Sequence, residues 1–558
     1  TGVWDDATAA KLDAGFRASG ASFGAEAAAK VRAALDRKRD KWVAMHREAC
    51  RATRISGEQS TALLDLRMGC LERRKREIGA LVTQLVTAPD AARVAASVEA
   101  VAQLPAIDAC GDRDALAAVL PPPPDPARRA EIDAVRDEIT AINALVWTGQ
   151  WPDARSRAER VSARAKQLDH APLVAEAGLA RGLAERHAGS YATAEAALTE
   201  AAQAAARAHL DEIAARVWAE LAWVVGYEQE RAPEGLALAS AAEATALRAS
   251  GTPMDLAQVA HTRATILLAK GDQPAALKEA ERALALLASG APAADLETAD
   301  LLTTQAMVRS AQGDYRAAEA AHRQALARRR AALGDSHPKV ADSLDNLGVV
   351  LFHQGAFADA RKHYEEALAL RVAALGPGHR DVGTSHNNLG GLAMDTGDAK
   401  AAALHLESAL AIYEKALGPT HGDLAIPLSN LGELAARRGD FARSLAYCTR
   451  ALAIDEAATP DDPKLAYDLV CIGEAQLGAG RPAEAIAPLE RALGLRTAAK
   501  GDAGELARTQ FALARALPAS ARVRARQLAA QAREGFAGAG DAWKDRLAAT
   551  DTWLAVPR

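Results

Sequence analysis

The chain has 558 residues, of which 49% are hydrophobic and 25% charged, a balance typical of a folded protein. Its net charge of −5 provides no broad basic surface, which argues against nucleic-acid binding. Aromatic residues make up only 4%, and alanine dominates the apolar residues, so the composition favours helices packed closely on helices. No segment shows the strict alternation of a half-buried strand, and we therefore expect an all-α protein.

The first 120 residues predict a region of long helices. One helix is expected from Gly24 to Arg54, and a second from about Gln59 to Val86, where the sequence TAPD ends one helix and starts the next. No apolar run is long enough to cross a bilayer, so we expect no membrane insertion by this chain. Because the chain starts with Thr1 and no leader segment precedes the first helix, we expect a processed form or a part of a longer protein.

The five cysteines form no C-x-x-C pair, which argues against a zinc ribbon or a thioredoxin-like motif. If residues 58–87 and 90–103 form a helical hairpin that turns near Pro89, Cys70 and Cys110 come to roughly the same height along it. A disulfide can then join them in an oxidising compartment, whereas in the cytosol all five cysteines would be free thiols. Cys448 and Cys471 are interpreted as small buried apolar residues.

Residues 121–126, which read PPPPDP, predict a stiff spacer because consecutive prolines cannot form a helix. They separate an N-terminal helical region, 1–120, from a periodic segment, 127–540. Residues 541–558 predict a terminal helix that caps the last repeat with Trp543 and Trp553.

A short cassette marks each turn between two helical patterns in the periodic segment. It consists of a glycine, any residue, a residue that is commonly aromatic, two further residues and an alanine. The glycine is expected to end one helix in the left-handed conformation, the aromatic ring to wedge between the helices, and the alanine to permit close packing. A degenerate copy is expected within QERAPEGLAL, residues 229–238. The cassettes begin at Gly149, Gly189, Gly271, Gly313, Gly355, Gly397, Gly439 and Gly480.

These cassettes, with the NLG triplets that precede several of them, resemble the tetratricopeptide repeat over about residues 130–537. The usual unit has about 34 residues. The longer unit of 42 residues here contains an insert, LGDSHP, LGPGHR or LGPTHG, and is similar to the kinesin-light-chain type. The resemblance implies a TPR-like α-solenoid, a right-handed superhelix of roughly nine or ten helical hairpins after a small helical bundle. It also implies a protein or peptide partner and no cofactor.

His379–Asp381 spells the H-R-D of a protein-kinase catalytic loop. His379, however, is one of three histidines, with His337 and His421, that recur 42 residues apart in the repeat insert. The asparagine that a kinase needs after the triplet and four further residues is replaced by His386, and no Gly-rich loop, D-F-G or Walker A sequence occurs. We therefore predict no catalytic residues in this chain.

The insert histidines also predict no metal site, because side chains one repeat apart are separated by at least about 8–10 Å and cannot converge on one ion. We interpret them as turn residues that cap carbonyls at the end of the second helix of each pair. The basic run Arg328–Arg330 is interpreted as a solvated helix face.

A binding surface is predicted on the first helix of each pair. When the leucine of NLG is numbered 7, positions 2, 5, 9 and 12 share one face, and in tetratricopeptide-repeat proteins this face lines the concave groove. Its polar, acidic and amide side chains suit an extended peptide, and the absence of Lys and Arg in three repeats argues against a carboxylate clamp. The predicted groove residues are Asp342, Asp345, Phe352, Thr384, Asn387, Met394, Ser429 and Glu433.

Kinesin-light-chain-type repeats carry groove asparagines at position 5, and only Asn387 matches that pattern here. A second ladder, Asn346, Asn388 and Asn430, lies at position 6. One residue turns a helical side chain by about 100°, toward the neighbouring helix. We interpret this second ladder as structural, with ligand binding as the less favoured alternative.

The N-terminal region suggests a context. Lys41–Arg74 and the later segment LPAIDACGD resemble the region that precedes tetratricopeptide repeats in a group of bacterial Ser/Thr protein kinases, where the kinase domain lies N-terminal. That resemblance implies a regulatory region, although the core of a helical bundle explains its Trp and Cys residues equally well. A self-contained sensor of a peptide or small ligand is the alternative. The identity of the partner, the oligomeric state and the choice between a cytoplasmic and an extracytoplasmic location stay open.

Overall fold

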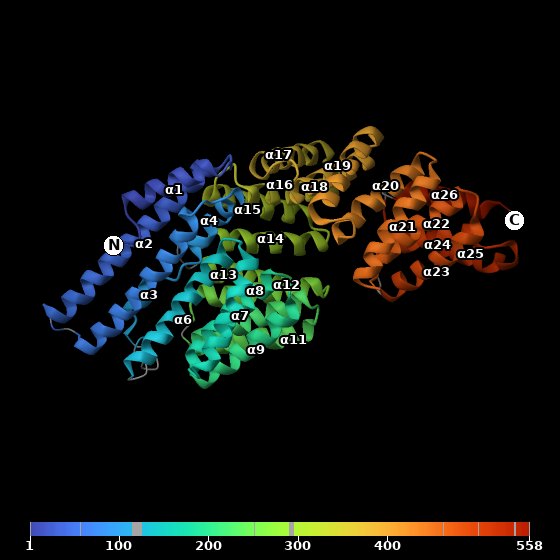
Figure 1. Ribbon diagram of the computed structural model, residues 1–558. Coiled ribbons are helices and arrows are strands. Elements are labelled where there is room, and N and C mark those ends of the chain that lie inside the picture. Colours follow the sequence, from blue (N-terminus) through green and yellow to red (C-terminus); the bar gives the residue numbers. More distant parts are fainter. Residues whose placement is uncertain are drawn as a thin grey trace. The chain divides into compact units, whose positions relative to one another are not determined.

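The computed structural model describes residues 2–55, 57, 59–113, 116, 125–249, 251–288, 295–460, 462–499, 502–540 and 543–556. Within these ranges all regular structure is helical and no strand occurs, which confirms the all-α prediction (Figure 1). The chain divides into two compact units. Unit 1 comprises Thr1–Ala356 and Ala373–Leu375, and unit 2 comprises Phe357–Val372 and Gly376–Arg558.

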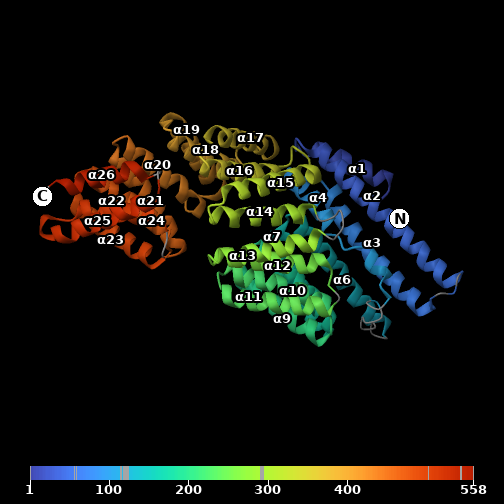
Figure 2. The same cartoon turned by 180° about the vertical axis from the view of Figure 1, so that it is seen from behind.

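Unit 1 begins with four helices and a 3-10 helix, which are followed by pairs of helices that pack against each other. The first two helices lie side by side (Figure 1 and Figure 2). The elements are α1 (Asp6–Ala18), α2 (Gly24–Arg54), α3 (Thr61–Val86), α4 (Ala91–Ala102), η1 (Asp108–Gly111), α6 (Pro126–Trp147), α7 (Trp151–Gln167), α8 (Ala171–His187), α9 (Tyr191–Arg207), α10 (Asp211–Trp223), η2 (Val224–Glu228), α11 (Ala232–Arg248), α12 (Pro253–Ala269), α13 (Gln273–Ala288), α14 (Asp295–Ala311), α15 (Tyr315–Leu333) and α16 (Pro338–His353).

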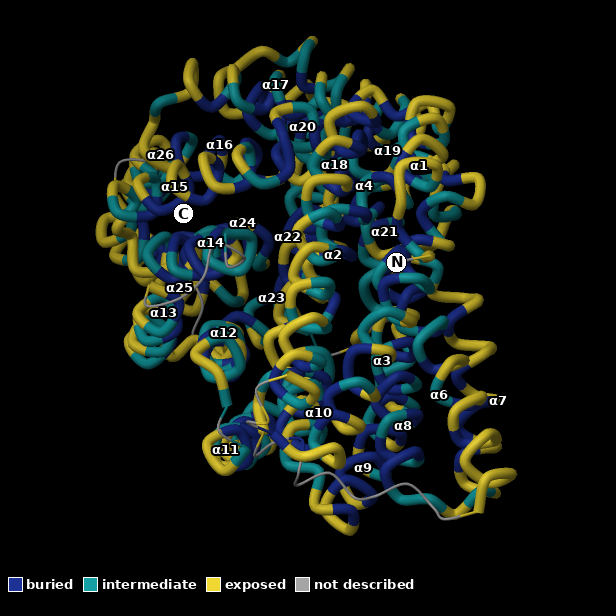
Figure 3. The backbone as a smooth tube through the Cα atoms, turned by 90° about the vertical axis from the view of Figure 1, so that its left-hand side faces the viewer, coloured by how far each residue is buried: buried dark blue, intermediate teal, exposed yellow. Residues whose placement is uncertain are grey.

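Unit 2 is also built of helices, and the last three residues of its first helix, Ala373–Leu375, are assigned to unit 1. Its elements are α17 (Phe357–Leu375), α18 (Arg380–Asp395), α19 (Ala399–Leu417), η4 (Gly422–Leu424), α20 (Ala425–Arg437), α21 (Phe441–Ala458), α22 (Leu465–Gly478), α23 (Pro482–Ala499), α24 (Ala503–Ala516), η5 (Ala519–Ala521), α25 (Arg522–Gly538) and α26 (Lys544–Ala555). Buried and exposed segments alternate along the helices of both units, as expected for amphipathic helices (Figure 3).

The cassettes form the turn of each helical pair as predicted. All eight cassette glycines have φ between 72° and 84°, the left-handed region in which glycine is favoured. The alanine of the cassette is fully buried, and Ser444 takes its place in one copy. In the first cassette the aromatic ring does not wedge between the two helices of its pair. Trp151 remains 42% exposed, and its ring stacks at 5.8 Å on His187, at the end of the next first helix.

The expected degenerate repeat is present and keeps its turn without glycine. Glu230 lies 41 residues from both Gly189 and Gly271 and has φ of 57°. The preceding helix α10 ends in η2, a π-helical turn. Gly235 stands in place of the cassette alanine, and its α-carbon is so close to Gly226 that a Cβ on either residue would clash. The two helices therefore approach through bare backbone in this repeat.

The N-terminal helices of unit 1 pack onto the repeat insert between α15 and α16. The His337 ring is 1% exposed, donates from Nε2 to the Ala95 carbonyl at 2.8 Å, and meets the Phe23 ring at 5.5 Å. Lys339 Nζ lies 2.6 Å from a carboxylate oxygen of Glu99. This contact joins residues about 240 positions apart and does not follow from any local pattern.

Several predicted boundaries can be compared with the helices. The helix expected from Gly24 to Arg54 is α2, with the same bounds. Pro121–Pro124 lie outside the described residues, and Asp125 caps the start of α6. Near the C-terminal end, Trp543 stacks on Phe536 with 5.4 Å between ring centroids. The proposed division into 1–120, 121–126, 127–540 and 541–558 remains a prediction.

Candidate functional site

The insert histidines have one shared role, but not the one predicted. His337, His379 and His421 each precede a helix, and each Nδ1 accepts a hydrogen bond at 3.2 Å from the backbone N–H two residues later. They therefore cap N–H groups at the start of the first helix, not carbonyls at the end of the second. In each cap the Nδ1 lone pair is the acceptor. Burial lowers the pKa of His337.

The residues of the apparent H-R-D motif take part in this helix cap. His379 accepts from the Asp381 N–H. Arg380 donates to Asp423 of the next insert at 2.9 Å, so it links two successive inserts. Within the described residues, no group of three or more His, Cys, Asp and Glu side chains could hold a metal ion. None of the described helices is long and apolar enough to span a bilayer.

In unit 1 the predicted groove residues differ in exposure. Asp342 is exposed, Phe352 is half-buried, and Asp345 is only 6% exposed. Val349, on the same face of α16, exposes 39% of its surface. A ligand on this face would therefore meet Asp342 and Val349 before it met Asp345.

In unit 2 two predicted residues of α18 already have protein contacts. The Thr384 hydroxyl lies 3.0 Å from the Tyr413 hydroxyl, and Met394 is buried in an apolar cluster with Leu406. Asn387 differs from both, because its Oδ1 is buried and makes no hydrogen bond. A buried amide oxygen without a donor is uncommon, since such groups are normally satisfied.

The predicted residues of α20 take part in side-chain pairs. The Ser429 hydroxyl donates to Oδ1 of the buried Asp468 on α22, and Glu433 accepts from Arg437 at 2.9 Å. Burial raises the pKa of Asp468 to about 7, and the neighbouring Asp455 contributes in the same direction. The position-6 ladder, Asn346, Asn388 and Asn430, is half-buried in all three repeats.

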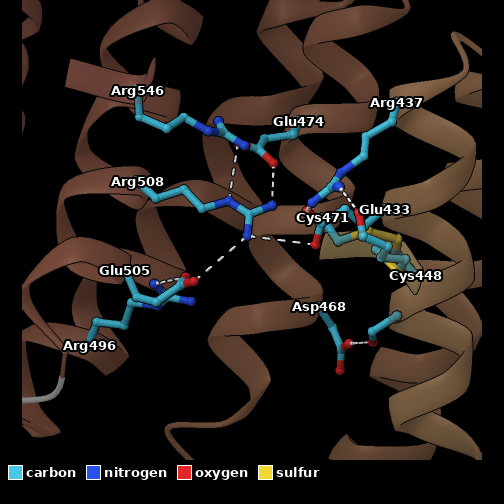
Figure 4. A network of polar contacts seen from close by, with 12 residues as sticks. Glu433, Arg437, Cys448, Asp468, Cys471, Glu474, Arg496, Glu505, Arg508 and Arg546 are labelled. Carbon is cyan, nitrogen blue, oxygen red and sulfur yellow. Dashed lines mark hydrogen bonds and ion pairs between the residues drawn. A yellow bond between two sulfur atoms is a disulfide. The ribbon is translucent and has the colours of Figure 1, made fainter. Parts of the chain in front are cut away.

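A network of ion pairs that the sequence analysis missed surrounds Glu474 (Figure 4). Glu474 accepts from Arg508 at 2.6 Å and from Arg546 at 2.8 Å. Burial alone would raise the pKa of Glu474, but the two guanidinium groups lower it to about 2. Arg496 donates to Glu505 at 2.6 Å, and Glu505 in turn lies 3.8 Å from Arg508.

The network marks one side of three successive first helices, which we name the α20–α24 face. Arg508 of α24 reaches Glu474 of α22, and its Nη1 also lies 4.0 Å from Glu433 of α20. These contacts show that the three residues lie on the same side of the three helices. The repeat register would have revealed Glu474 and Arg508, because extending the position numbering places them at positions 9 and 2. The face comprises Ile426, Ser429, Glu433, Tyr467, Val470, Glu474, Arg508, Phe511 and Arg515.

Two large apolar side chains are exposed on this face. Ile426 is 61% exposed and Tyr467 is 52% exposed, and both occupy position 2 of first helices that pack together. The guanidinium of Arg496 lies beneath the Tyr467 ring, 4.7 Å from its centroid. Apolar side chains on adjacent helices, bordered by charged groups, are typical of an interaction surface.

The basic run Arg328–Arg330 is not uniformly solvated. Arg329 is 8% exposed and donates at 2.6 Å to Ser343, on the next first helix. Arg371, 42 residues later, donates in the same way to Ser385 at 2.7 Å. The solvated-face interpretation was wrong for Arg329, and the 42-residue recurrence of the Arg–Ser pair was the signal that it overlooked.

Four of the cysteines are joined in two disulfides. Cys70 and Cys110 are bonded, with Cα atoms 5.6 Å apart. Cys448 and Cys471, interpreted from the sequence as separate apolar residues, are buried but also bonded, with Cα atoms 5.9 Å apart. The fifth, Cys50, is a free thiol of intermediate exposure.

Residues 297–498 match the family model described as Tetratricopeptide repeat, in overlapping stretches 297–373, 343–415, 381–457 and 423–498. These residues therefore form tetratricopeptide repeats, and the chain has an all-α, TPR-like solenoid fold. No curated protein matches the chain in sequence.

Solved structures similar to the chain include BtubC (BKLC) from P. vanneervenii, with 26% identity and a TM-score of 0.35 over 41% of this chain and 91% of that chain. A putative kinesin light chain from Podosopora anserina, with nearly identical TPR-like repeats, shows 20% identity and a TM-score of 0.31 over 37% and 98%. The apo form of RapI shows 12% identity and a TM-score of 0.47 over 66% and 99%.

Proposed function

We propose that this chain, which carries tetratricopeptide repeats over residues 297–498, is a protein-interaction scaffold that binds an extended peptide on the α20–α24 face. The observation that supports this proposal is the pair Ile426 and Tyr467, exposed at the same position of two packed first helices. Their removal from water by a partner would stabilise a complex by about 25 cal/mol for each Å² of apolar surface buried. The surrounding charges would orient the partner more than attract it, because most of them are already paired.

Asn387 adds a polar contact to this proposal. It lies on α18, which packs against α20, and its Oδ1 has no hydrogen-bond donor in the folded chain. A change of rotamer that exposes this oxygen would let a peptide backbone N–H supply that donor, and the amide NH₂ of the same side chain could donate to a peptide carbonyl. Asn387 is thus proposed to fix the register of the peptide, while Ile426 and Tyr467 contact its apolar side chains.

The test is binding of the full chain to a peptide array, followed by titration of the best peptide. Ile426→Lys and Tyr467→Lys are expected to weaken binding by tenfold or more, since each buries a charge in an apolar contact, about 1.4 kcal/mol per factor of ten. Asn387→Ala is expected to weaken it about fivefold or more. Leu404→Lys is the matched control, because Leu404 is 64% exposed on the second helix α19. Equal binding by all variants would remove the proposal.

The other predicted groove residues, Asp342, Asp345 and Phe352 in unit 1 and Thr384, Met394, Ser429 and Glu433 in unit 2, also remain proposals. Asp345→Ala in the same assay tests unit 1 separately. Unchanged affinity would restrict the binding surface to unit 2.

A finer proposal concerns the parent protein. The resemblance of Lys41–Arg74 to the segment that precedes such repeats in bacterial Ser/Thr protein kinases supports a role as the regulatory region of such a kinase. A repeat protein of this kind is typically non-catalytic, so we expect no phosphotransfer from ATP by this chain alone. The coding sequence upstream of Thr1 tests the proposal, and the absence of a kinase domain there would exclude it.

A further inference from the structure

The second disulfide occupies two places that other repeats fill with different residues. Cys448 lies on the second helix α21 and contacts Gly432 of α20, sixteen residues earlier in the chain. Leucine stands at the same offset of sixteen in other repeats, where it packs on the equivalent glycine. These pairs are Gly182 with Leu198, Gly390 with Leu406, and Gly473 with Leu489.

Cys471 departs from the repeat pattern as well. It stands nine residues before the cassette glycine Gly480, at position 6 of α22. The three preceding first helices carry Asn346, Asn388 and Asn430 at that position. The two flanking repeats carry leucine at the first of these places, the three preceding repeats carry asparagine at the second, and the two cysteines found there instead are the ones that meet. If Cys448 and Cys471 served only as small apolar residues, nothing would require them to lie opposite each other.

We propose that Cys448–Cys471 is a covalent staple built between consecutive repeats, and that the chain acquires it and Cys70–Cys110 in an oxidising compartment. Each bond forms by exchange with the disulfide of an oxidised dithiol carrier. The two thiols lose two electrons and two protons, the S–S bond of the carrier breaks, and the carrier leaves as a dithiol. Disulfides of this kind persist outside the reducing cytosol. The inference does not depend on peptide binding.

The staple lies close to the side-chain contacts that link the helices of the α20–α24 face (Figure 4). On α22, Cys471 is three residues after Asp468 and three before Glu474, so all three belong to adjacent turns. Asp468 accepts a hydrogen bond from Ser429 of α20, and Glu474 accepts one from Arg508 of α24. The disulfide adds a covalent link from α22 to α21 and so limits the rotation of α22 that would misalign these contacts.

The first test maps disulfides in the full chain after secretion to the bacterial periplasm, with thiols alkylated before any reductant is added. We expect a peptide that links Cys448 to Cys471, a second that links Cys70 to Cys110, and an alkylated Cys50. Alkylation of both Cys448 and Cys471 in that sample would overturn the proposal. The same chain made in a reducing cytosol is the comparison and is expected to be alkylated at all five cysteines.

The second test asks whether the bond acts as a staple. Hydrogen exchange is measured for α21 and α22 with and without dithiothreitol, in wild type and in C448L/C471N, which carries the residues of the neighbouring repeats. Reduction is expected to speed exchange in these helices about tenfold in wild type and to leave the variant unchanged. Unchanged exchange in reduced wild type would exclude the staple. If the variant does not fold, the oxidised and reduced wild-type samples still decide the question.

Discussion

Two acidic residues of α22, Asp468 and Glu474, show how strongly neighbours determine the state of a buried carboxyl group. Asp468 has a hydroxyl donor and another carboxyl group beside it, and its pKa is raised to about 7, chiefly by burial. Glu474 is half-buried, but two guanidinium groups face it, and its pKa is lowered to about 2. The residue type in the sequence could not distinguish these cases, because Arg508 and Arg546 lie 34 and 72 residues away.

Asp468→Asn is expected to stabilise unit 2 at high pH. The folded pKa is about 7 and the ordinary value 3.8, so the folded state keeps a proton that the unfolded state has released. The contribution of Asp468 to the unfolding free energy is therefore complete below about pH 4 and falls as pH rises toward 7. Asparagine is expected to remove this dependence and to add about 1–3 kcal/mol at pH 8.

Urea unfolding of wild type and variant at pH 5 and pH 8 measures this change. Asp359→Asn, at an exposed carboxyl group of α17, is the control and should change stability by less than about 0.5 kcal/mol at either pH. A larger gain for Asp468→Asn at pH 5 than at pH 8 would contradict the assigned direction of the shift.

Glu474→Gln is expected to destabilise unit 2 at pH 7 by about 2–4 kcal/mol, because it leaves Arg508 and Arg546 without their shared countercharge. Since the pKa of Glu474 is lowered from 4.5 to about 2, its stabilisation is complete above pH 4.5 and is lost as pH falls toward 2. Glu490→Gln removes a carboxylate from an exposed pair with Arg524 and is expected to cost less than about 1 kcal/mol. Both unfolding free energies are measured by chemical unfolding. Equal losses for the two variants would show that the network around Glu474 stabilises unit 2 no more than an exposed ion pair does.

At the level of helices, the turn between the two helices of a repeat was the best-predicted element. A left-handed residue, a small buried residue and a helix start are local requirements, so they leave a pattern that recurs along the chain. The π-helical turn η2 left no such pattern, because it depends on the close approach of Gly226 and Gly235 in space. Helical periodicity likewise sufficed to place positions 2, 5, 9 and 12 on one side of each first helix, whereas their role as a binding groove stays a proposal. The burial of Met394 and the bond between Ser429 and Asp468 could not be predicted in this way, since each depends on a neighbouring helix.

Glu230 and Gly271 permit a reciprocal test of the turn. Both have positive φ, 57° and 84°, and a Cβ at Gly271 would meet no atom within 4 Å. Glu230→Gly is expected to stabilise unit 1 by about 0.5–1 kcal/mol by relieving the left-handed strain, while Gly271→Ala costs about 1 kcal/mol. Thermal unfolding of the two variants compares them, and a loss of stability in Glu230→Gly would show that its side chain makes a compensating contact.

At the scale of the whole molecule, sequence periodicity predicted the stacking of repeats but not the contact between the N-terminal helices and the α15–α16 insert. Each repeat contacts its neighbours in the chain, so the repeat pattern predicts only contacts between residues that are close in sequence. The first insert differs from the later two in carrying Lys339 where they carry Asp381 and Asp423. Only Lys339 complements Glu99, so this ion pair is specific to the first of the three inserts.

Lys339→Glu is expected to loosen that docking, because it places two carboxylates together. Hydrogen exchange in α4 should then rise about fivefold, equivalent to about 1 kcal/mol. The exchange of both charges, Glu99→Lys with Lys339→Glu, should restore protection, while Lys278→Glu on the exposed side of α13 should have no effect on α4. Failure of the double variant to recover would mean that the ion pair is not what holds α4.

The docked N-terminal region also sets an order of folding during synthesis. Lys30 donates to the Ala331 carbonyl at 2.7 Å across 301 positions, and the Ala95–His337 bond spans 242. Ribosomes add about 5–20 residues per second, so the first helices are complete roughly 10–50 s before their docking surface exists. Through this interval the groups that will meet the insert, the Lys30 ammonium and the His337 acceptor at Ala95 among them, lack these partners in the nascent chain. The N-terminal helices therefore remain without their docking partner during this time. They can make their contacts with the α15–α16 insert only after α16 has been synthesised.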